Sequence, residues 1–349
     1  MLSNIKLENF RNHKSYNLDL DKITVLIGRN GVGKTNILEA IVFLSFCRSF
    51  REEDKKNIIS YDSDYARITG DDLELFFSRF PRLIMKAKER GIPRKISEFI
   101  GILPSVIFSP ETISIISGSP GSRRRFLDIM ISQVDREYLE SLMEYKKVRA
   151  QRNSLLQRIS NREASENELD FWDKELVKKA EFINKKREAA VLFLNKLISG
   201  FYQEISGDAS NSLTLTLIRN YEGGLVENLK LLRRREVAYG GTIIGPHRDD
   251  LQFLLNNHNM INFASRGEMK SAILALKVSE LKFLENHRGD KENSTKPLLL
   301  LDDIFSEFDP IRRSHLSKLI FDYQAVITST EKEHLSPDLL KMAKVVELG

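Results

Sequence analysis

The chain has 349 residues, 41% hydrophobic and 30% charged, which is enough to bury a large core in one elaborate domain or two lobes. Its single cysteine, Cys47, excludes an intramolecular disulfide framework, and no apolar run approaches the roughly 20 residues that cross a bilayer. The first residues lack a signal-peptide core, so we expect a cytoplasmic protein without membrane contact. The net charge of +5 is compatible with a polyanionic partner but does not establish one.

The N-terminal part predicts strands and one helix. Short strands are expected within residues 1–27, and the last of them is a buried apolar run at 23–27. Apolar residues at helical spacing follow from 37 to 44. Residues 65–88 alternate well enough for an antiparallel meander, and 106–108 predict a core strand.

The segment between that first buried strand and helix has the spacing G-x-x-x-x-G-K-[ST] of a phosphate-binding loop. Gly28 and Gly33 let the backbone curl so that its N–H groups face an anion, and the helix start adds positive potential. Lys34 would reach the β- and γ-phosphates, and the Thr35 hydroxyl would hold Mg²⁺. A plain glycine turn is the alternative, but a strand before and a helix after favour a nucleotide. The residues assigned to it are Gly28, Arg29, Asn30, Gly31, Val32, Gly33, Lys34, Thr35 and Asn36.

The middle of the chain predicts a helical lobe. Apolar residues recur at helical spacing over 126–159 and again over 172–201, with a polar turn at 160–167 between them. This pattern predicts a helical hairpin. Neither helix carries a strict heptad with paired charges, so a packed lobe is favoured over a coiled coil.

The C-terminal part returns to alternating strands and helices. Strands are expected near 213–217 and 251–255, a helix near 268–285, a buried strand at 298–303, a helix at 311–321 and a strand at 325–328. We therefore expect an α/β fold, a P-loop ATPase core of mixed and parallel sheet with an inserted helical hairpin lobe. The expected division is 1–115 and 241–349 for the ATPase core and 116–240 for the helical lobe.

Two carboxylates follow the apolar run of residues 298–301, as in a Walker B strand. Asp302 would bind Mg²⁺ opposite Thr35, and Asp303 would orient the attacking water or accept its proton. Two solvated aspartates at a strand end are the alternative. The phosphate-binding loop upstream favours the catalytic interpretation.

Two further segments resemble motifs of ABC-type ATPases. Residues 306–309 resemble the D-loop, and residues 264–268 resemble the signature S-x-G-[QE] at a helix start. Ser265 and Gly267 would form a second anion site with the N–H groups of that helix. Ser265 is also a typical N-cap, and capping is compatible with a phosphate contact.

Taken together, these motifs resemble the RecF family of bacterial recombination-repair ATPases, relatives of the SMC heads. The resemblance runs from residue 5 to about 330, nearly the whole chain. Residues 245–251, Gly-Pro-His-Arg-Asp-Asp-Leu, are the most diagnostic, and a turn tied by Arg–Asp pairing is their simplest interpretation. The other matching stretches are 9–12, 31–40, 48–51, 108–111, 123–128, 151–156 and the Walker B segment.

The resemblance implies an ATP- and Mg²⁺-dependent homodimer in which ATP is sandwiched between two copies. It also implies binding to gapped or single-strand/double-strand junction DNA, weak DNA-stimulated ATP hydrolysis, and recombinase loading with RecR and RecO in fork recovery and the SOS response. Basic runs supply candidate DNA contacts, although such runs are as typical of solvated helix faces. The candidates are Arg123, Arg124, Arg125, Lys185, Lys186 and Arg187, with a further run at 233–235, and Arg11 and Arg48 are candidates for adenine or phosphate.

Three departures from the motifs bear on activity. Glu268 stands where RecF proteins usually carry glutamine, residues 109–111 lack the Q-loop glutamine, and residues 328–330 offer hydroxyls in place of the switch histidine. These departures indicate slow hydrolysis, which suits a switch better than a pump. The alternatives are an ATP-binding scaffold without productive hydrolysis and, less favoured, the nucleotide-binding subunit of an ABC transporter or a P-loop kinase.

Overall fold

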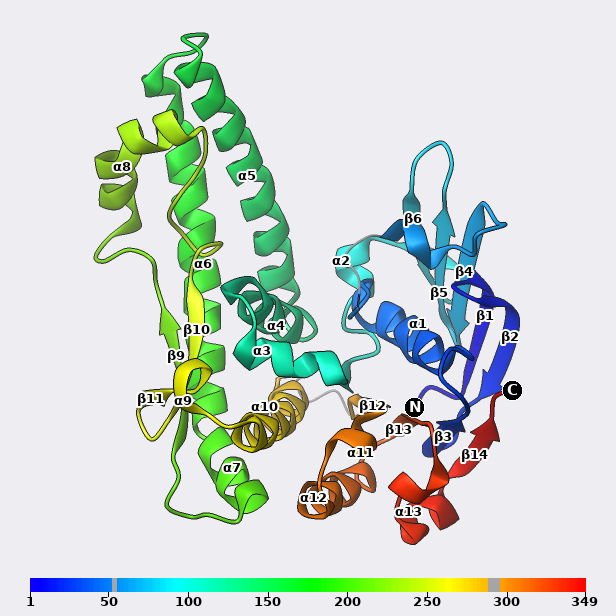
Figure 1. Ribbon diagram of the computed structural model, residues 1–349. Coiled ribbons are helices and arrows are strands. Elements are labelled where there is room, and N and C mark those ends of the chain that lie inside the picture. Colours follow the sequence, from blue (N-terminus) through cyan, green and yellow to red (C-terminus); the bar gives the residue numbers. More distant parts are fainter. Residues whose placement is uncertain (52–54, 288–295) are drawn as a thin grey trace. The chain divides into compact units, whose positions relative to one another are not determined.

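The computed structural model describes residues 1–51, 55–287 and 296–349 (Figure 1). Its contacts divide the chain into two compact units. The first, here called the sheet unit, contains 1–113, 204–207 and 270–349; the second, the helical unit, contains 114–203 and 208–269. Residues 241–269, which the motif order assigned to the ATPase core, cluster by contact with the helical unit.

The sheet unit is centred on a parallel sheet in the order β14-β3-β13-β12-β8. Every residue of β3, β8, β12 and β13 is buried, as expected for a parallel sheet covered on both faces. Because β3 and β12 run in the same direction, the loop after one and the carboxylates after the other lie at the same edge. The strands are β3 Ile23–Ile27, β8 Ser105–Phe108, β12 Leu298–Asp302, β13 Ala325–Ser329 and β14 Lys344–Glu347.

A second sheet in this unit is antiparallel, in the order β2-β1-β4-β5-β6-β7. It contains the meander predicted for residues 65–88. Helix α1, Lys34–Phe46, contacts strands of both sheets and is buried on nearly all sides, so its hydrophobicity is not confined to one stripe (Figure 1). The strands are β1 Asn4–Phe10, β2 His13–Asp19, β4 Tyr65–Gly70, β5 Leu73–Ser78, β6 Ile84–Glu89 and β7 Ile92–Arg94.

Shorter elements complete the sheet unit. The α-helices are α2 Ile96–Phe99, α11 Ile304–Glu307, α12 Pro310–Ile320 and α13 Pro337–Met342, and the 3₁₀ turns are Lys55–Ile58, Pro110–Ile113 and Lys332–His334. Strand β14 pairs with β3, and the backbone N–H of Leu348 donates to the carbonyl of Ile27 at 2.7 Å. A Cβ at Gly28 would lie 2.5 Å from the Leu348 carbonyl oxygen, so this C-terminal strand supports the start of the loop after β3.

The helical unit is built on the predicted hairpin. Helices α5, Arg136–Ser160, and α6, Leu169–Asn195, run side by side (Figure 1). Near the turn they bury a cluster of Leu155, Leu156, Ile159 and Leu169. The remaining helices are α3 Ser114–Ser117, α4 Pro120–Ser132, α7 Ile198–Ser206, α8 Leu225–Tyr239 and α9 Met260–Phe263, and the strands are β9 Leu213–Ile218, β10 Asp250–Leu255 and β11 His258–Asn259. Residues 204–206, at the end of α7, cluster with the sheet unit.

A fully buried arginine ties this unit together. The Arg152 guanidinium on α5 binds Asp173 of α6 at 2.7 Å, Glu236 of α8 at 2.6 Å and the Thr242 hydroxyl at 2.9 Å. None of its surface is exposed. Because a buried charge is stable only when its partners satisfy it, this network fixes three segments of the unit to one side chain.

Helix α10, Arg266–Asn286, starts in the helical unit and continues into the sheet unit. None of the helices in the described part of the chain has the length and apolar character needed to span a bilayer.

Candidate nucleotide-binding site

The loop between β3 and α1 has the backbone that a phosphate cradle requires. Gly31 and Gly33 have φ of +89° and +105°, a region that glycine adopts without strain. A Cβ on Gly33 would lie 2.4 Å from His13 Nε2 and 2.8 Å from the side-chain oxygen of Asn12. Only glycine therefore fits at Gly33, the residue just before helix α1.

The ammonium group of Lys34 lies inside this loop. Its Nζ donates to the carbonyls of Gly28 at 2.6 Å and Arg29 at 3.0 Å. Burial lowers the pKa of Lys34, and the carboxylates of Asp303 and Asp302 oppose that shift. The cation thus lies in a partly desolvated position where an anion would stabilise it.

Polar side chains from β2 and the preceding turn support the loop from outside. Because a carbonyl only accepts, His13 Nε2 donates to Gly33 O at 3.2 Å. Asn36 donates to Asn12 at 2.7 Å and accepts from Arg51 at 3.2 Å. Asn12 belongs to the predicted stretch 9–12, but the sequence assigned it no role. His13 was not predicted, because a histidine at the start of an otherwise ordinary strand does not by itself indicate a site.

The carboxylate of Asp302, the last residue of β12, meets the loop. Thr35 Oγ1 donates to Asp302 Oδ1 at 2.9 Å, and Thr328 Oγ1 donates to the same oxygen at 2.8 Å. Burial raises the pKa of Asp302, and the two hydroxyl hydrogen bonds oppose the shift. The carboxylate is thus held by neutral donors and has capacity for a cation.

The second carboxylate occupies a strained position at the same edge. Asp303 has φ of +48°, and its N–H donates to Thr328 Oγ1 at 2.9 Å. Its Oδ1 is buried and has no hydrogen-bond partner within the described ranges. A buried acceptor without a donor is costly, so this oxygen is available to a water or another donor in the site. Thr328 links both aspartates and is one of the three hydroxyl residues expected to replace the switch histidine.

These residues fit a nucleoside triphosphate with Mg²⁺. The loop and Lys34 offer positive groups to phosphates, while Thr35 and Asp302 offer the oxygen ligands that Mg²⁺ takes alongside phosphate oxygens. Within residues 1–51, 55–287 and 296–349, no group of three or more His, Cys, Asp or Glu side chains could hold a metal alone. A cation at this edge would therefore depend on the phosphates of the nucleotide.

The signature segment forms a reciprocal cap at the start of α10. Ser265 donates to Glu268 Oε2 from its N–H at 2.7 Å and from its hydroxyl at 2.8 Å, while the Glu268 N–H donates to Ser265 Oγ at 3.2 Å. Gly267 lies in the first turn between them. The carboxylate at the position where glutamine is usual therefore turns back onto the cap.

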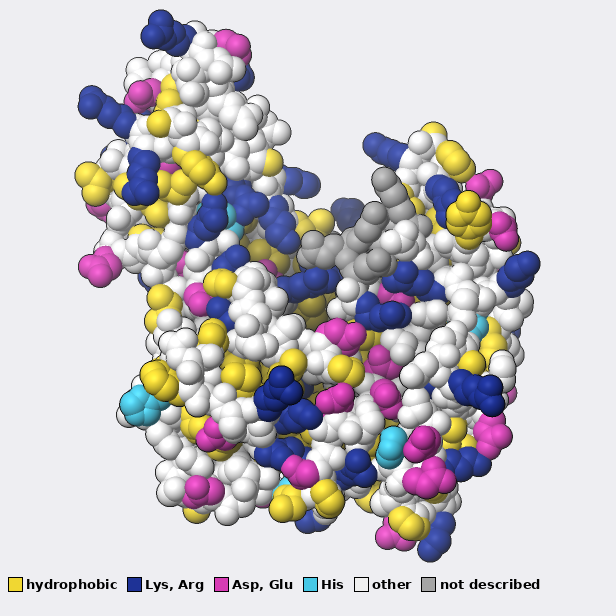
Figure 2. Space-filling model, in the orientation of Figure 1, with side chains coloured by type: hydrophobic (Ala, Val, Ile, Leu, Met, Phe, Trp, Pro, Cys, Tyr) yellow, Lys and Arg dark blue, Asp and Glu magenta, His cyan; other side chains and the backbone are white. Residues whose placement is uncertain are grey.

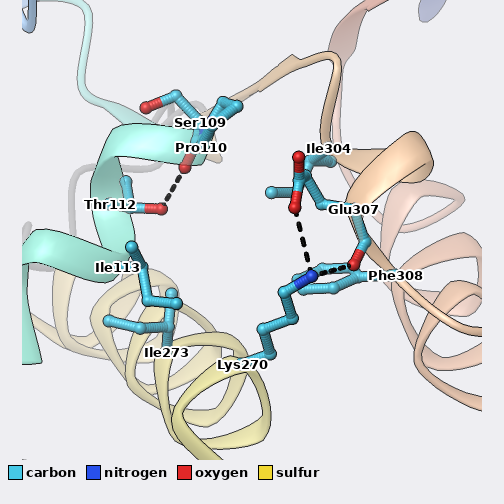
Figure 3. A pocket seen from close by; sticks show the side chains of 9 residues that line it. All are labelled: Ser109, Pro110, Thr112, Ile113, Lys270, Ile273, Ile304, Glu307 and Phe308. Atoms are coloured by element: carbon cyan, nitrogen blue, oxygen red, sulfur yellow. Dashed lines mark hydrogen bonds and ion pairs between the residues drawn. The ribbon is translucent and has the colours of Figure 1, made fainter. Parts of the chain in front are cut away.

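The D-loop segment is held against α10. Lys270 Nζ donates to the backbone carbonyl of Glu307 at 2.6 Å and to its carboxylate at 3.1 Å (Figure 3). Ser306 Oγ donates to the carbonyl of Asp303 at 2.7 Å. A small pocket opens beside these contacts, and its walls are Ser109, Pro110, Thr112, Ile113, Lys270, Ile273, Ile304, Glu307 and Phe308 (Figure 3). The position of the absent Q-loop glutamine thus lies across this pocket from the D-loop.

Two of the predicted DNA contacts have another role in the structure. Arg123 and Arg187 are each 2% exposed. Arg123 binds Asp250 at 2.6 Å, and Arg187 binds Asp128 at 2.8 Å. Because both guanidinium groups are buried in internal ion pairs, we correct the expectation that these two arginines face DNA.

The other candidates are more accessible. Lys185 is exposed, while Lys186, which binds Asp135 at 2.6 Å, is half-buried, as are Arg124 and Arg125. In the sheet unit, Arg11 makes a two-point ion pair with the buried Glu39, at 2.9 and 2.8 Å.

Arg48 is exposed. Of the two adenine candidates, Arg48 is thus the accessible one.

Comparison with known proteins agrees with these motifs. Residues 1–347 match the family model described as RecF/RecN/SMC N terminal domain. The DNA replication and repair protein RecF of Bacillus cereus (strain AH820) is 34% identical, with 99% of this chain and 96% of the relative covered. The same protein of Bacillus thuringiensis (strain Al Hakam) has the same identity and coverage.

Solved structures give the same result. The structure of the recombination mediator protein RecF-ATP in the RecFOR pathway superposes with a TM-score of 0.86 at 32% identity, covering 96% of this chain and 93% of that one. An Smc head domain from Pyrococcus furiosus, bound to the C-terminal domain of ScpA, has a TM-score of 0.53 at 18% identity, covers 100% of this chain and 94% of that one, and supports the fold alone. The chain therefore belongs to the RecF family of DNA replication and repair proteins, with the fold of an SMC-like ABC ATPase head.

Proposed function

We propose that this protein is an ATP-controlled DNA-binding switch of recombinational repair and replication-fork recovery. The observation that carries the proposal is that Thr35 bonds Asp302 at one sheet edge, where Thr328 links Asp302 to Asp303. That arrangement has the parts that phosphoryl transfer requires, with one buried acceptor left open.

In this proposal each residue has a defined task. Lys34 and the N–H groups of residues 28–36 bind the β- and γ-phosphates, and Thr35 with Asp302 holds Mg²⁺. Asp303 orients the attacking water and accepts its proton. Bound ATP supplies the phosphoanhydride whose hydrolysis resets the switch. Slow turnover follows from the absence of the usual Q-loop glutamine and switch histidine. Stimulation of this turnover by DNA is a further part of the proposal.

The switch itself is a homodimer. The capped helix start at Ser265 and Gly267 would complete the nucleotide site of a second copy, so that two copies close over two nucleotides. Closure aligns basic surfaces of both copies on gapped or junction DNA, and hydrolysis reopens them. RecO and RecR are the proposed protein partners for recombinase loading, in line with the RecFOR pathway named for the similar solved structure.

Sedimentation velocity tests the dimer. With a non-hydrolysable nucleotide and Mg²⁺ the wild type should sediment as a dimer, and Lys34→Ala should weaken dimerisation at least tenfold by removing a phosphate contact. Asp303→Asn should trap the dimer with ordinary ATP. Lys6→Ala, an exposed lysine of β1, is the matched control. A wild type that remains a single copy at every concentration overturns the proposal.

A second candidate is an ATP-binding scaffold for repair partners that does not hydrolyse ATP productively. It is favoured by the Thr328 hydroxyl, which is already bonded to both aspartates in place of a switch histidine. ATP hydrolysis measured with and without gapped DNA separates the two functions. Turnover that DNA accelerates supports the switch, while no turnover in either condition supports the scaffold.

A further inference from the structure

The diagnostic segment 245–251 is clamped to helix α5. Gly245 has φ of +119°, and a Cβ there would lie 2.8 Å from the Tyr145 hydroxyl oxygen. His247 Nε2 bonds the Thr242 carbonyl at 3.1 Å and must be the donor, so Nδ1 accepts the Tyr145 hydroxyl at 2.7 Å. Burial and nearby arginines lower the pKa of His247 to about 3, which keeps this imidazole neutral.

The acidic groups around this segment are already engaged or enclosed. Asp250 pairs with Arg123, and Asp128 pairs with Arg187, whose Nη1 also donates to the Pro246 carbonyl at 2.7 Å. Asp249 is completely buried. These contacts form a charged scaffold around the segment in which the carboxylates already have cationic neighbours, Arg124 among them.

Three further arginines lie near His247, and we call Arg124, Arg149 and Arg248 the arginine cluster. Arg124 Nη1 donates to the backbone carbonyl of Asp249 at 2.6 Å, and Arg248 is the neighbouring residue. Arg149 lies one helical turn after Tyr145 on α5. All three are close enough to His247 to lower its pKa. Among the described residues, neither Arg149 nor Arg248 is in an ion pair.

Exposure agrees with this arrangement. Arg248 is exposed and Arg149 half-buried. Figure 2 shows Lys and Arg side chains gathered around a histidine on the helical unit, where α5 and α6 lie in Figure 1. The carboxylates of Asp250, Asp128 and Asp249 act on Arg124. The guanidinium groups of Arg149 and Arg248 are in no ion pair among the described residues, so they repel one another, and an anion would relieve that repulsion.

We propose that the arginine cluster binds the backbone phosphates of DNA, which rests on the DNA binding proposed above. Guanidinium groups bind phosphate oxygens by paired hydrogen bonds, and the clamped segment fixes their spacing. In this proposal the segment 245–251 positions the arginines in addition to forming a turn. It holds Arg248 and, through the Asp249 carbonyl, Arg124 on one surface with Arg149. Phosphates of a free nucleotide share this chemistry, so the experiment must separate the two sources.

The test compares two double variants that remove the same charge. Arg149→Gln with Arg248→Gln removes two members of the cluster. Lys147→Gln with Arg158→Gln removes two exposed charges from α5, and Lys147 points away because it is two residues from Arg149. Fluorescence anisotropy measures binding to gapped DNA at several salt concentrations. The cluster variant should bind at least tenfold more weakly, and its log–log salt slope should fall by about 1.8, roughly 0.9 for each duplex phosphate contact.

The outcomes separate the inference from the proposed function. A wild type that does not bind DNA overturns both, whereas a wild type that binds while both double variants lose affinity equally overturns only the arginine cluster. Inorganic triphosphate is the second probe, and loss of its binding with DNA binding intact assigns the cluster to free phosphates and overturns the inference. ATP-dependent dimerisation should be unchanged. If the double variant unfolds, Arg248→Gln alone should lower the slope by about 0.9.

Discussion

The Ser265–Glu268 cap shows how one residue changes the meaning of a motif. Glutamate at this position would repel a nearby γ-phosphate, but its carboxylate accepts two hydrogen bonds from Ser265. The same bonds occupy the serine hydroxyl, which must leave Glu268 before it can donate to a phosphate. Glutamine could accept the same bonds, but a charged carboxylate accepts them more strongly. A switch with this cap would therefore exchange partners, and close, more slowly than one with glutamine.

His247 gives a pH dependence at the residue scale. Its pKa is lowered to about 3 by burial and by Arg149, Arg248 and Arg124, so the unfolded chain binds this proton more tightly than the folded one. The stability that this residue contributes is present above its ordinary pKa of about 6.5 and falls as the pH decreases toward about 3. Between pH 7.5 and 5, the wild type should lose about 2 kcal/mol more than His247→Gln.

Urea unfolding at the two pH values measures this difference. His258→Gln, at an exposed histidine of β11, is the control and should follow the wild type. Equal losses in the wild type and His247→Gln would contradict the neutral, buried imidazole.

Residues with a local motif were predictable, and residues defined by distant contacts were not. Thr35 and Asp302 could be paired in advance because strand, loop and helix patterns placed both at one sheet edge. The burial of Arg123 and Arg187 could not, because it depends on Asp250 and Asp128, whose proximity is set by the fold of the helical unit. His13 was missed for the same reason, since its role exists only where β2 passes Gly33.

Helices and strands were likewise predictable where the pattern in the sequence is local. The helical hairpin, the meander and the strands at 105–108 and 298–302 had strong periodicity or continuous apolar runs. Strand β14, Lys-Val-Val-Glu, had neither, because its two apolar residues are adjacent and flanked by charged ones. Its pairing with β3 decides its conformation. The network around Arg152 is also an element-scale feature, since one side chain joins α5, α6 and α8.

Replacing Arg152 should strongly destabilise the helical unit. Arg152→Met keeps much of the side-chain volume but leaves Asp173 and Glu236 buried without their common partner. The expected loss is about 3–5 kcal/mol in the free energy of unfolding, measured by urea titration. Arg158→Met, on the exposed part of the same helix, should change it by less than about 0.5 kcal/mol. A loss as small as that control would show that the network contributes little.

At the scale of the whole molecule, the proposed switch couples two ligands through one closed dimer. Thermodynamic linkage then requires reciprocity, so the factor by which a non-hydrolysable nucleotide tightens DNA binding must equal the factor by which DNA tightens nucleotide binding. We expect a factor of about 5–150, the usual range for such coupling. Calorimetric titration of each ligand with and without the other measures both factors. A factor of one would mean that nucleotide and DNA bind independently.

The pairing of β14 with β3 has a consequence for the order in which this protein matures. Thr24 pairs with Lys344 and Ile27 with Glu347. Strand β3, which leads into the glycine loop, is therefore synthesised long before its neighbour β14. Such distant pairing is slow to form. A nascent chain therefore contains the loop's sequence long before β14 is available to support the start of that loop.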